Sequence, residues 1–186
     1  MSKRLYLTVT LITILSVVNL FIPNAVGADK DSTRTGWIKQ FTVIEQGGPA
    51  PDVKFTNSDG EKVTLADFQG RVLLVNFWAT WCAPCVKEMP SLDRLQAKFG
   101  SADFQVVAVN EDRGGAKIAG PFLQKIGVFN LALFVDDKMK LMRSLKVRGL
   151  PTSFLVNREG RIVGKLAGFF EWDTPKAEAL ITHYIN

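Results

Sequence analysis

Hydrophobic and polar positions follow two different patterns along the chain. Short, nearly unbroken apolar runs are typical of strands buried on both faces of a sheet, and residues 71–78 form the clearest of them. Other stretches carry an apolar residue every three or four positions, as one face of a helix does, most clearly over residues 82–99. Strands that alternate with helices favour a parallel sheet. In chain order, the patterns predict strands over 71–78, 104–110 and 131–135 and helices over 82–99, 121–126 and 137–145.

Two other regions predict antiparallel hairpins. The first contains Asp59-Gly60, a dipeptide typical of tight hairpin turns, and the second turns at Gly160. Thr174-Pro175 then predicts the start of a last helix that reaches about Tyr184. Together these features predict an α/β fold with a central mixed sheet, helices on both of its faces and an N-terminal β-hairpin extension. The hairpin strands are predicted over residues 53–55, 62–64, 152–157 and 161–168.

The chain begins with a targeting segment. Lys3 and Arg4 precede the uncharged stretch Leu5–Ile22, and small residues lead to Ala28, where a signal peptidase would cut. The stretch is also just long enough for a tilted membrane helix. A cleaved signal peptide and a membrane anchor both place the folded part in the periplasm or otherwise outside the cytoplasm. The predicted division is 1–28 for this segment, 29–50 for a linker and N-terminal extension, and 51–186 for the main domain.

Composition narrows the classes of function. With 186 residues, 47% of them apolar and 22% charged, the chain resembles ordinary globular proteins, which excludes collagen, a coiled coil and disorder throughout. Removing residues 1–28 takes away two of the 23 basic residues and none of the 18 acidic ones, so the exported part has a net charge of 21 minus 18, or +3. Its basic residues are scattered without a run of more than two, so we expect a solvated surface and no nucleic-acid partner.

A single histidine and two cysteines limit the possible chemistry. A Ser-His-Asp triad or a histidine-rich zinc site needs more imidazoles than His183 provides, so we expect no metal and place the chemistry on Cys82 and Cys85. The two lie at a predicted strand-to-helix junction, where the helix N-terminus favours a thiolate at Cys82. Cys85, one turn further along, would attack the mixed disulfide that Cys82 forms.

Residues beside the cysteines would shape the site. Pro84 stiffens the loop between them, and Trp78 and Trp81 supply apolar surface that would cover the sulfurs and contact a substrate. Two alternatives to redox chemistry are open at this point. One is a passive disulfide, although so short a loop constrains the unfolded chain little. The other is a pair of thiolates that holds a Cu(I) ion.

Two motifs of the chain resemble one known family. Leu73–Pro90 reads LLVNFWATWCAPCVKEMP and Gly149–Val156 reads GLPTSFLV. Both are similar to the TlpA and ResA group of extracytoplasmic thiol-disulfide oxidoreductases, and the tail from Ala167 to Trp172 looks more like TlpA. The resemblance implies a thioredoxin fold and a monomer without a cofactor that reduces protein disulfides, with a DsbD- or CcdA-type membrane protein as electron donor. It further implies substrates of cytochrome c or cytochrome oxidase biogenesis, such as apocytochrome c or the copper-site cysteines of oxidase subunit II.

The resemblance also implies roles for residues outside the CxxC motif. Pro151 matches the family's cis-proline, and a cis bond would turn the Leu150 backbone outward to pair with an extended substrate segment. Asn76 stands where classical thioredoxin has a buried aspartate, so another base is needed for the proton of Cys85. Glu88 lies on the same helix face as Cys85, and the family has a glutamate at this place. We expect a partly desolvated Glu88 to exchange that proton; the alternative is a surface glutamate near the helix N-terminus.

Three other functional classes are compatible with parts of this pattern. A thiol oxidase shares the fold and differs in how strongly the Cys82 thiolate is stabilised. A peroxidase of the thioredoxin superfamily carries a PxxxTxxC pattern, but here Thr80 is two residues before Cys82 and the proline is missing. A copper carrier of the Sco type uses CxxxC and a distant histidine, a spacing that this chain lacks.

Overall fold

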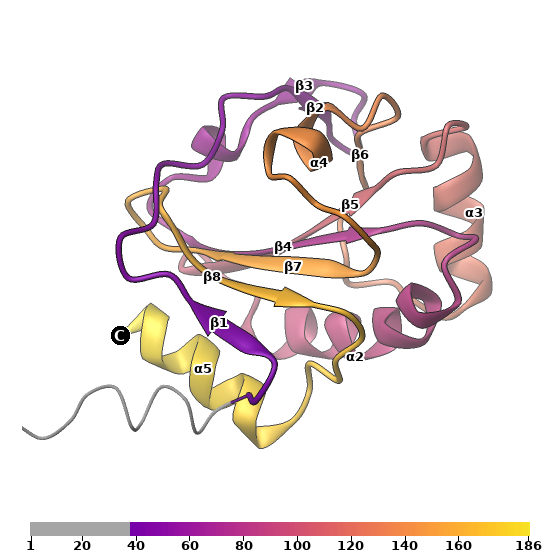
Figure 1. The fold of residues 1–186 in the computed structure, drawn as a ribbon. Coiled ribbons are helices and arrows are strands. Elements are labelled where there is room, and N and C mark those ends of the chain that lie inside the picture. The colour runs from indigo at the N-terminus through magenta and orange to yellow at the C-terminus, as the bar shows by residue number, and fades with distance from the viewer. Residues whose placement is uncertain (1–37) are drawn as a thin grey trace, which may run out of the picture. The chain divides into compact units, whose positions relative to one another are not determined.

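The computed structural model describes residues 38–186, and the strands within them form one mixed eight-stranded sheet in the order β1-β8-β7-β4-β5-β6-β2-β3 (Figure 1). The predicted signal or anchor segment lies outside the described residues. Between residues 38 and 186, no helix is both long enough and apolar enough to cross a membrane. The strands are β1 (Phe41–Val43), β2 (Phe55–Thr56), β3 (Lys62–Val63), β4 (Val72–Trp78), β5 (Phe104–Asn110), β6 (Phe134–Val135), β7 (Thr152–Val156) and β8 (Ile162–Ala167).

Strand β4 is the centre of the sheet, and all seven of its residues are buried. It pairs in parallel with β5 and antiparallel with β7, so the sheet is mixed as predicted. Side chains alternate between its two faces: Leu74 and Trp78 join one apolar cluster, whereas Val75 and Phe77 join the other. The nearly unbroken apolar run is therefore explained by a strand that is covered on both sides.

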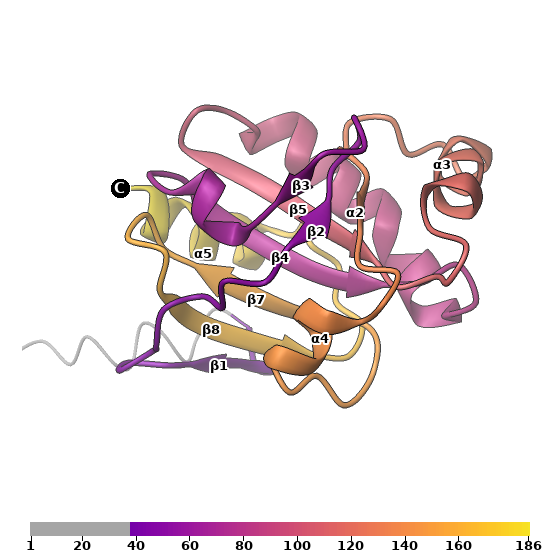
Figure 2. The same cartoon turned by 90° about the horizontal axis from the view of Figure 1, so that it is seen from above.

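Helices cover both faces of the sheet, as predicted. Figures 1 and 2 show α2 and α5 on one face and α4 on the other. Residues of α2, α3 and α5 pack in the cluster that contains Trp78, and residues of η1 and α4 pack in the cluster that contains Phe77. The helices are the 3-10 helix η1 (Leu65–Phe68), α2 (Ala83–Phe99), α3 (Ala116–Lys125), α4 (Lys140–Ser144) and α5 (Pro175–Ile185).

Segments that precede β4 form both edges of the sheet. β1 pairs antiparallel with β8 at one edge, and the hairpin of β2 and β3 pairs with β6 at the other. Ile38, just before β1, is buried in the core. The pairing of β2 with β3 confirms the predicted N-terminal hairpin. With β1 and β3 at the two edges, β4 and β7 lie inside the sheet.

Two helices differ from their predicted bounds. α3 begins at Ala116, five residues before the predicted start, and Pro121 lies inside it. A proline more often starts a helix than lies within one, but Gly115 has a φ of 56° and its carbonyl already accepts the first helical hydrogen bonds. α4 begins at Lys140 instead of near Asp137, because the Asp136 carboxylate accepts hydrogen bonds from the backbone N–H groups of its first turn.

Candidate active site

The two cysteines lie at the junction of β4 and α2, and they form a disulfide. Cys82 is the N-cap of α2, and its sulfur accepts a hydrogen bond from the backbone N–H of Cys85 at 3.3 Å. Cys85 is 1% exposed and Cys82 is 6% exposed, while the neighbouring Trp81 is 67% exposed. Pro84 lies in the first turn of α2 on the protein surface. The helix N-terminus thus points at Cys82, the more exposed of the two cysteine residues, where it favours a thiolate.

The loop before Cys82 is fixed by the end of β5. The Asp112 carboxylate accepts hydrogen bonds from the backbone N–H and the hydroxyl of Thr80, both at 3.0 Å. Asn110 donates a further bond to Asp112 at 2.7 Å. Asp112 is not among the site residues that the sequence predicted. Its position could have indicated a role, because Asp112 is a polar residue just after an apolar strand, and neighbouring parallel strands end at the same edge of a sheet.

The Leu150–Pro151 peptide bond is cis, as the resemblance implied. β7 begins directly after it, and Thr152 pairs with Phe77 near the end of β4, so Pro151 lies close to the origin of the cysteine loop. The Pro151 carbonyl accepts a hydrogen bond from Gly168 at 2.9 Å. Leu150 is half-buried and packs against the core cluster that contains both cysteines.

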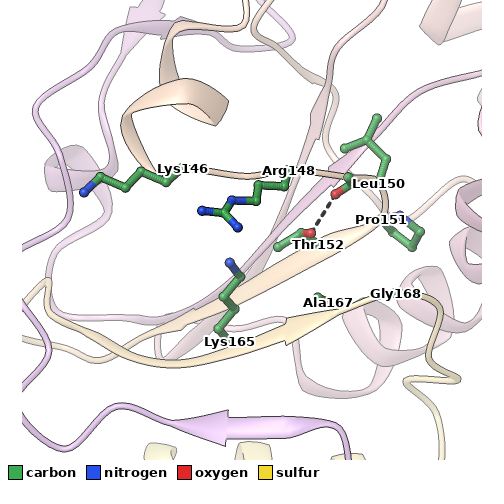
Figure 3. Close-up of a pocket in the computed structure, with 9 residues that line it drawn as sticks. Lys146, Arg148, Leu150, Pro151, Thr152, Lys165, Ala167 and Gly168 are labelled. Atoms are coloured by element: carbon green, nitrogen blue, oxygen red, sulfur yellow. Dashed lines mark hydrogen bonds between the residues drawn. The ribbon is translucent and has the colours of Figure 1, made fainter.

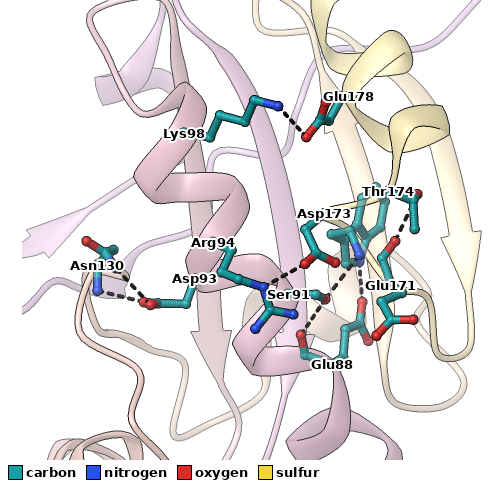
Figure 4. Close-up of polar contacts among 11 residues, drawn as sticks. Glu88, Ser91, Asp93, Arg94, Lys98, Asn130, Glu171, Asp173, Thr174 and Glu178 are labelled. Carbon is teal, nitrogen blue, oxygen red and sulfur yellow. Dashed lines mark hydrogen bonds and ion pairs between the residues drawn. The ribbon is translucent and has the colours of Figure 1, made fainter.

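Glu88 is buried, with 1% of its surface exposed, so the alternative of a surface glutamate is wrong. Its Oε1 accepts hydrogen bonds from the indole N–H of Trp172 and, at 3.4 Å, from the Asn76 amide. Its Oε2 has no hydrogen-bond partner within residues 38–186. Burial raises the pKa of Glu88 to about 8, although the bond from Trp172 acts in the opposite direction. Figure 4 shows this carboxyl between α2 and the segment that leads into α5.

Trp172 is a site residue that the sequence did not predict. Its side chain is fully buried, and its backbone N–H donates to the Ser91 hydroxyl at 3.0 Å. Ser91 in turn donates to the Glu88 carbonyl at 2.7 Å. Trp172 and Glu88 are 84 residues apart, so no local pattern could have predicted the contact. Outside this network, Arg94 pairs with Asp173 at 2.6 Å, which adds a second link between α2 and the same segment (Figure 4).

Glu111 is a second buried carboxyl near the cysteine loop. It follows β5, its backbone N–H donates to the Trp78 carbonyl at 2.9 Å, and it is 1% exposed. Neither of its carboxyl oxygens has a hydrogen-bond partner among the described residues. Burial, reinforced by the charge of Asp136 and opposed by that of Arg143, raises the pKa of Glu111 to about 9. Glu111 is likewise not among the site residues that the sequence predicted.

Within residues 38–186, no three or more His, Cys, Asp or Glu side chains are grouped so that they could hold a metal ion. Asn76, which replaces the thioredoxin aspartate, donates to Glu88 and, at 3.0 Å, to Ser153. The arrangement therefore combines a disulfide at a helix N-terminus, a cis-proline and a buried acid on the helix of the cysteines.

Comparisons with known proteins agree with this arrangement. Residues 45–181 match the Redoxin family. The thiol-disulfide oxidoreductase ResA of Bacillus subtilis (strain 168) is 32% identical over 187 residues, which cover 100% of this chain and 93% of that protein. ResA of Bacillus cereus (strain ATCC 10987 / NRS 248) is 30% identical over 152 residues, which cover 82% and 85% of the two chains. The solved structure of StoA from Bacillus subtilis has a TM-score of 0.57 and 26% identity, over 72% of this chain and 98% of that one.

Proposed function

Because the chain belongs to the Redoxin family and is a thioredoxin-like thiol-disulfide oxidoreductase, we propose that it reduces protein disulfides outside the cytoplasm through Cys82 and Cys85. The observation that carries the proposal is the Cys82–Cys85 disulfide at the N-terminus of α2. The two ResA proteins among the relatives reported above confirm the resemblance to the TlpA and ResA group.

The reaction proceeds by two thiol-disulfide exchanges. The Cys82 thiolate attacks one sulfur of the substrate disulfide, forms a mixed disulfide and releases the other substrate sulfur as a thiolate, which takes up a proton. The Cys85 thiolate then attacks the Cys82 sulfur, which forms the Cys82–Cys85 disulfide and releases the second substrate thiol. Two electrons pass from the two cysteines to the substrate, and the two substrate thiolates take up their protons from water, so an external reductant must restore the dithiol.

Glu88 takes the proton of Cys85 in the second exchange. It lies one helical turn from Cys85, and its burial favours the protonated carboxyl. With a pKa of about 8, Glu88 holds a proton at neutral pH in the disulfide form, which is the state expected after it has accepted the proton of Cys85. When the disulfide is reduced again, the same proton can return to the Cys85 sulfur.

Trp81, Pro84, Leu150 and Pro151 bind the substrate. Trp81 is exposed beside Cys82 and offers an apolar face. No hydrogen bond to the Leu150 backbone occurs among residues 38–186, so an extended substrate segment can pair with it. Pro151 adds no N–H near the sulfurs.

The physiological setting follows from the resemblance. The substrates are disulfides of cytochrome c or cytochrome oxidase biogenesis, the electron donor is a membrane protein of the DsbD or CcdA type, and residues 5–22 export or anchor a monomer. The exposed lipoprotein thioredoxin Etrx1 of Streptococcus pneumoniae, 28% identical with a TM-score of 0.59 over 72% of this chain and 99% of its own, supports an extracytoplasmic site.

The reduction potential of the Cys82–Cys85 couple tests the direction of the reaction. Equilibration with glutathione or dithiothreitol should give a value near that of thioredoxin, about −270 mV. A value near that of DsbA, about −120 mV, would show that the protein is an oxidase instead. Cys85→Ser should accumulate mixed disulfides with its substrates, which identifies them, and Cys82→Ser is the matched control that should trap none.

A further inference from the structure

A basic groove extends from the cis-proline along the start of β7 and the end of β8. It has a volume of about 510 Å³ and contains Leu150, Pro151 and three cationic side chains: Lys146, Arg148 and Lys165. Lys146 and Arg148 belong to the segment between α4 and β7, whereas Lys165 comes from β8. Figure 3 shows the charged ends of Arg148 and Lys165 pointing toward each other, with Lys146 further along the same side. The fold therefore gathers three positive charges next to the proposed substrate-binding backbone.

These three cations have no carboxylate partner within the part of the chain that the structure describes. The ion pairs there join Arg94 to Asp173, Lys98 to Glu178 and Arg158 to Asp103, and no aspartate or glutamate lines the groove. Lys165 lies over the ring of Phe154, 5.3 Å from its centroid. Like charges that converge without a counter-ion repel one another, so a bound anion would be favoured.

We propose that this basic groove binds acidic side chains of the substrate segment that carries the disulfide. The inference rests on the proposed function, because the groove is continuous with the Leu150–Pro151 backbone where that segment would pair. In an extended segment, every second side chain points to the same face, and residues advance by about 3.3 Å. A carboxylate a few residues from the substrate cysteine therefore reaches the groove, where Arg148 can bind it in bidentate fashion and the lysines add charge.

A protein segment suits this groove better than a nucleic acid or a free anion. The groove also has an apolar part, formed by Leu150, Pro151 and Ala167, which would contact the aliphatic portion of a peptide. The three charges are on exposed or half-buried side chains, and a long polyanion would need a wider basic surface than they provide. The groove therefore changes how readily a substrate binds, and it leaves the rates of the two thiol-disulfide exchanges unchanged.

Matched peptides test this inference on the full chain. Two oxidised peptides with the same internal disulfide carry two glutamates or two glutamines on each side of it. We expect the wild-type protein to reduce the glutamate peptide with a kcat/KM about tenfold higher than that of the glutamine peptide at low salt, because its carboxylates pair with the partly exposed cations of the groove. Sodium chloride at about 0.5 M should remove most of the difference.

Substitutions assign the effect to the groove. The variant Lys146→Gln/Arg148→Gln/Lys165→Gln should lose the preference for glutamate and reduce the glutamine peptide at the wild-type rate, which also shows that it is folded. The control variant Lys39→Gln/Lys125→Gln/Lys176→Gln removes the same charge from exposed positions elsewhere and should keep the preference. Because Lys165 packs on Phe154, the double variant Lys146→Gln/Arg148→Gln is a second test, with a partial loss expected.

Three outcomes would overturn the inference. Equal reduction of the two peptides by the wild type shows that the groove does not recognise acidic side chains. Equal loss in both triple variants shows a general charge effect. Inorganic phosphate that abolishes the preference more strongly than sodium chloride of equal ionic strength shows an inorganic-anion site. A protein that reduces neither peptide would instead contradict the proposed function.

Discussion

Glu88 and Glu111 are two buried carboxyls near the same cysteine loop, but their surroundings differ. Both are 1% exposed, and burial raises the pKa of each, to about 8 for Glu88 and to about 9 for Glu111. Glu88 accepts hydrogen bonds from Trp172 and Asn76, whereas neither oxygen of Glu111 has a partner within residues 38–186. Burial is the largest cause of the raised pKa in both cases, so a raised pKa does not distinguish a residue that transfers protons from one that does not.

The positions of Glu88 and Glu111 in the fold distinguish their roles. Glu88 is on α2, one turn from Cys85, with donors that fix one of its oxygens. Glu111 follows β5 and lies in the electrostatic neighbourhood of Asp112 and Asp136, which respectively fix the Thr80 loop and the start of α4. We therefore expect Glu88 to act in the reaction and Glu111 to affect mainly stability.

The largest effect is expected for Glu88→Gln. Loss of a proton acceptor typically costs about a hundredfold or more, so resolution of the mixed disulfide at pH 7 should slow by about that factor. Glu111→Gln, which makes the same chemical change at an equally buried site, should alter this rate less than about twofold. Stopped-flow measurement of substrate release after mixed-disulfide formation gives both rates. Equal rates for Glu88→Gln and the wild type would contradict the assignment of Glu88.

Stability should fall as the pH rises from about 5 to 9. The folded state binds the protons of Glu88 and Glu111 more tightly than the unfolded state, because both pKa values are raised from 4.5. Their stabilising contribution is therefore complete below pH 4.5 and is lost through pH 8 to 9, with a slope of up to about 1.4 kcal/mol per pH unit for each group.

Urea unfolding of the disulfide form across this range measures the slope. Glu111→Gln should flatten it and be more stable than the wild type by on the order of 2 kcal/mol at pH 8, because a neutral amide does not have to take up a proton on folding. An unchanged slope in both glutamine variants would mean that neither carboxyl keeps its proton in the folded protein.

Trp172→Phe should have an intermediate effect. It removes the N–H that donates to Glu88 and that lowers the pKa of this carboxyl, so the pKa should rise further. Resolution at pH 7 should slow by about tenfold, in line with the loss of one hydrogen bond to a charged group, about 1.5 kcal/mol. The pH profile of resolution should move to higher pH, which simple loss of packing would not produce. A slower rate with an unchanged profile would indicate packing alone.

Arg94→Gln should have the smallest effect. Its ion pair with Asp173 links α2 to the segment of Trp172, but the Arg94 side chain is 56% exposed, and such pairs contribute under about 1 kcal/mol. The free energy of unfolding should fall by less than that amount, and the rate of resolution should not change. A marked loss of rate would show that Glu88 depends on this exposed link and not only on its buried contacts.

The sequence alone determined the central strand, the helix that carries the cysteines and the chemistry of the pair. A nearly unbroken apolar run followed by CxxC and a helical repeat is a local pattern, and β4 and α2 lie within one residue of their predicted bounds. The errors in the predicted starts of α3 and α4 are local as well, since Pro121 lies inside α3 and Asp136 delays the start of α4.

Only the tertiary structure decided the surroundings of these elements. From the sequence, Glu88 could be either exposed or buried. In the structure, α5 and the segment before it cover α2 and place Trp172 against Glu88. Lys146, Arg148 and Lys165 are isolated charges in the sequence, and the pairing of β7 with β8 brings them to one groove. Periodicity and motifs report neighbours along the chain, whereas burial and charge clustering depend on contacts between distant segments, and those contacts set the pKa of an acid and the charge of a binding surface.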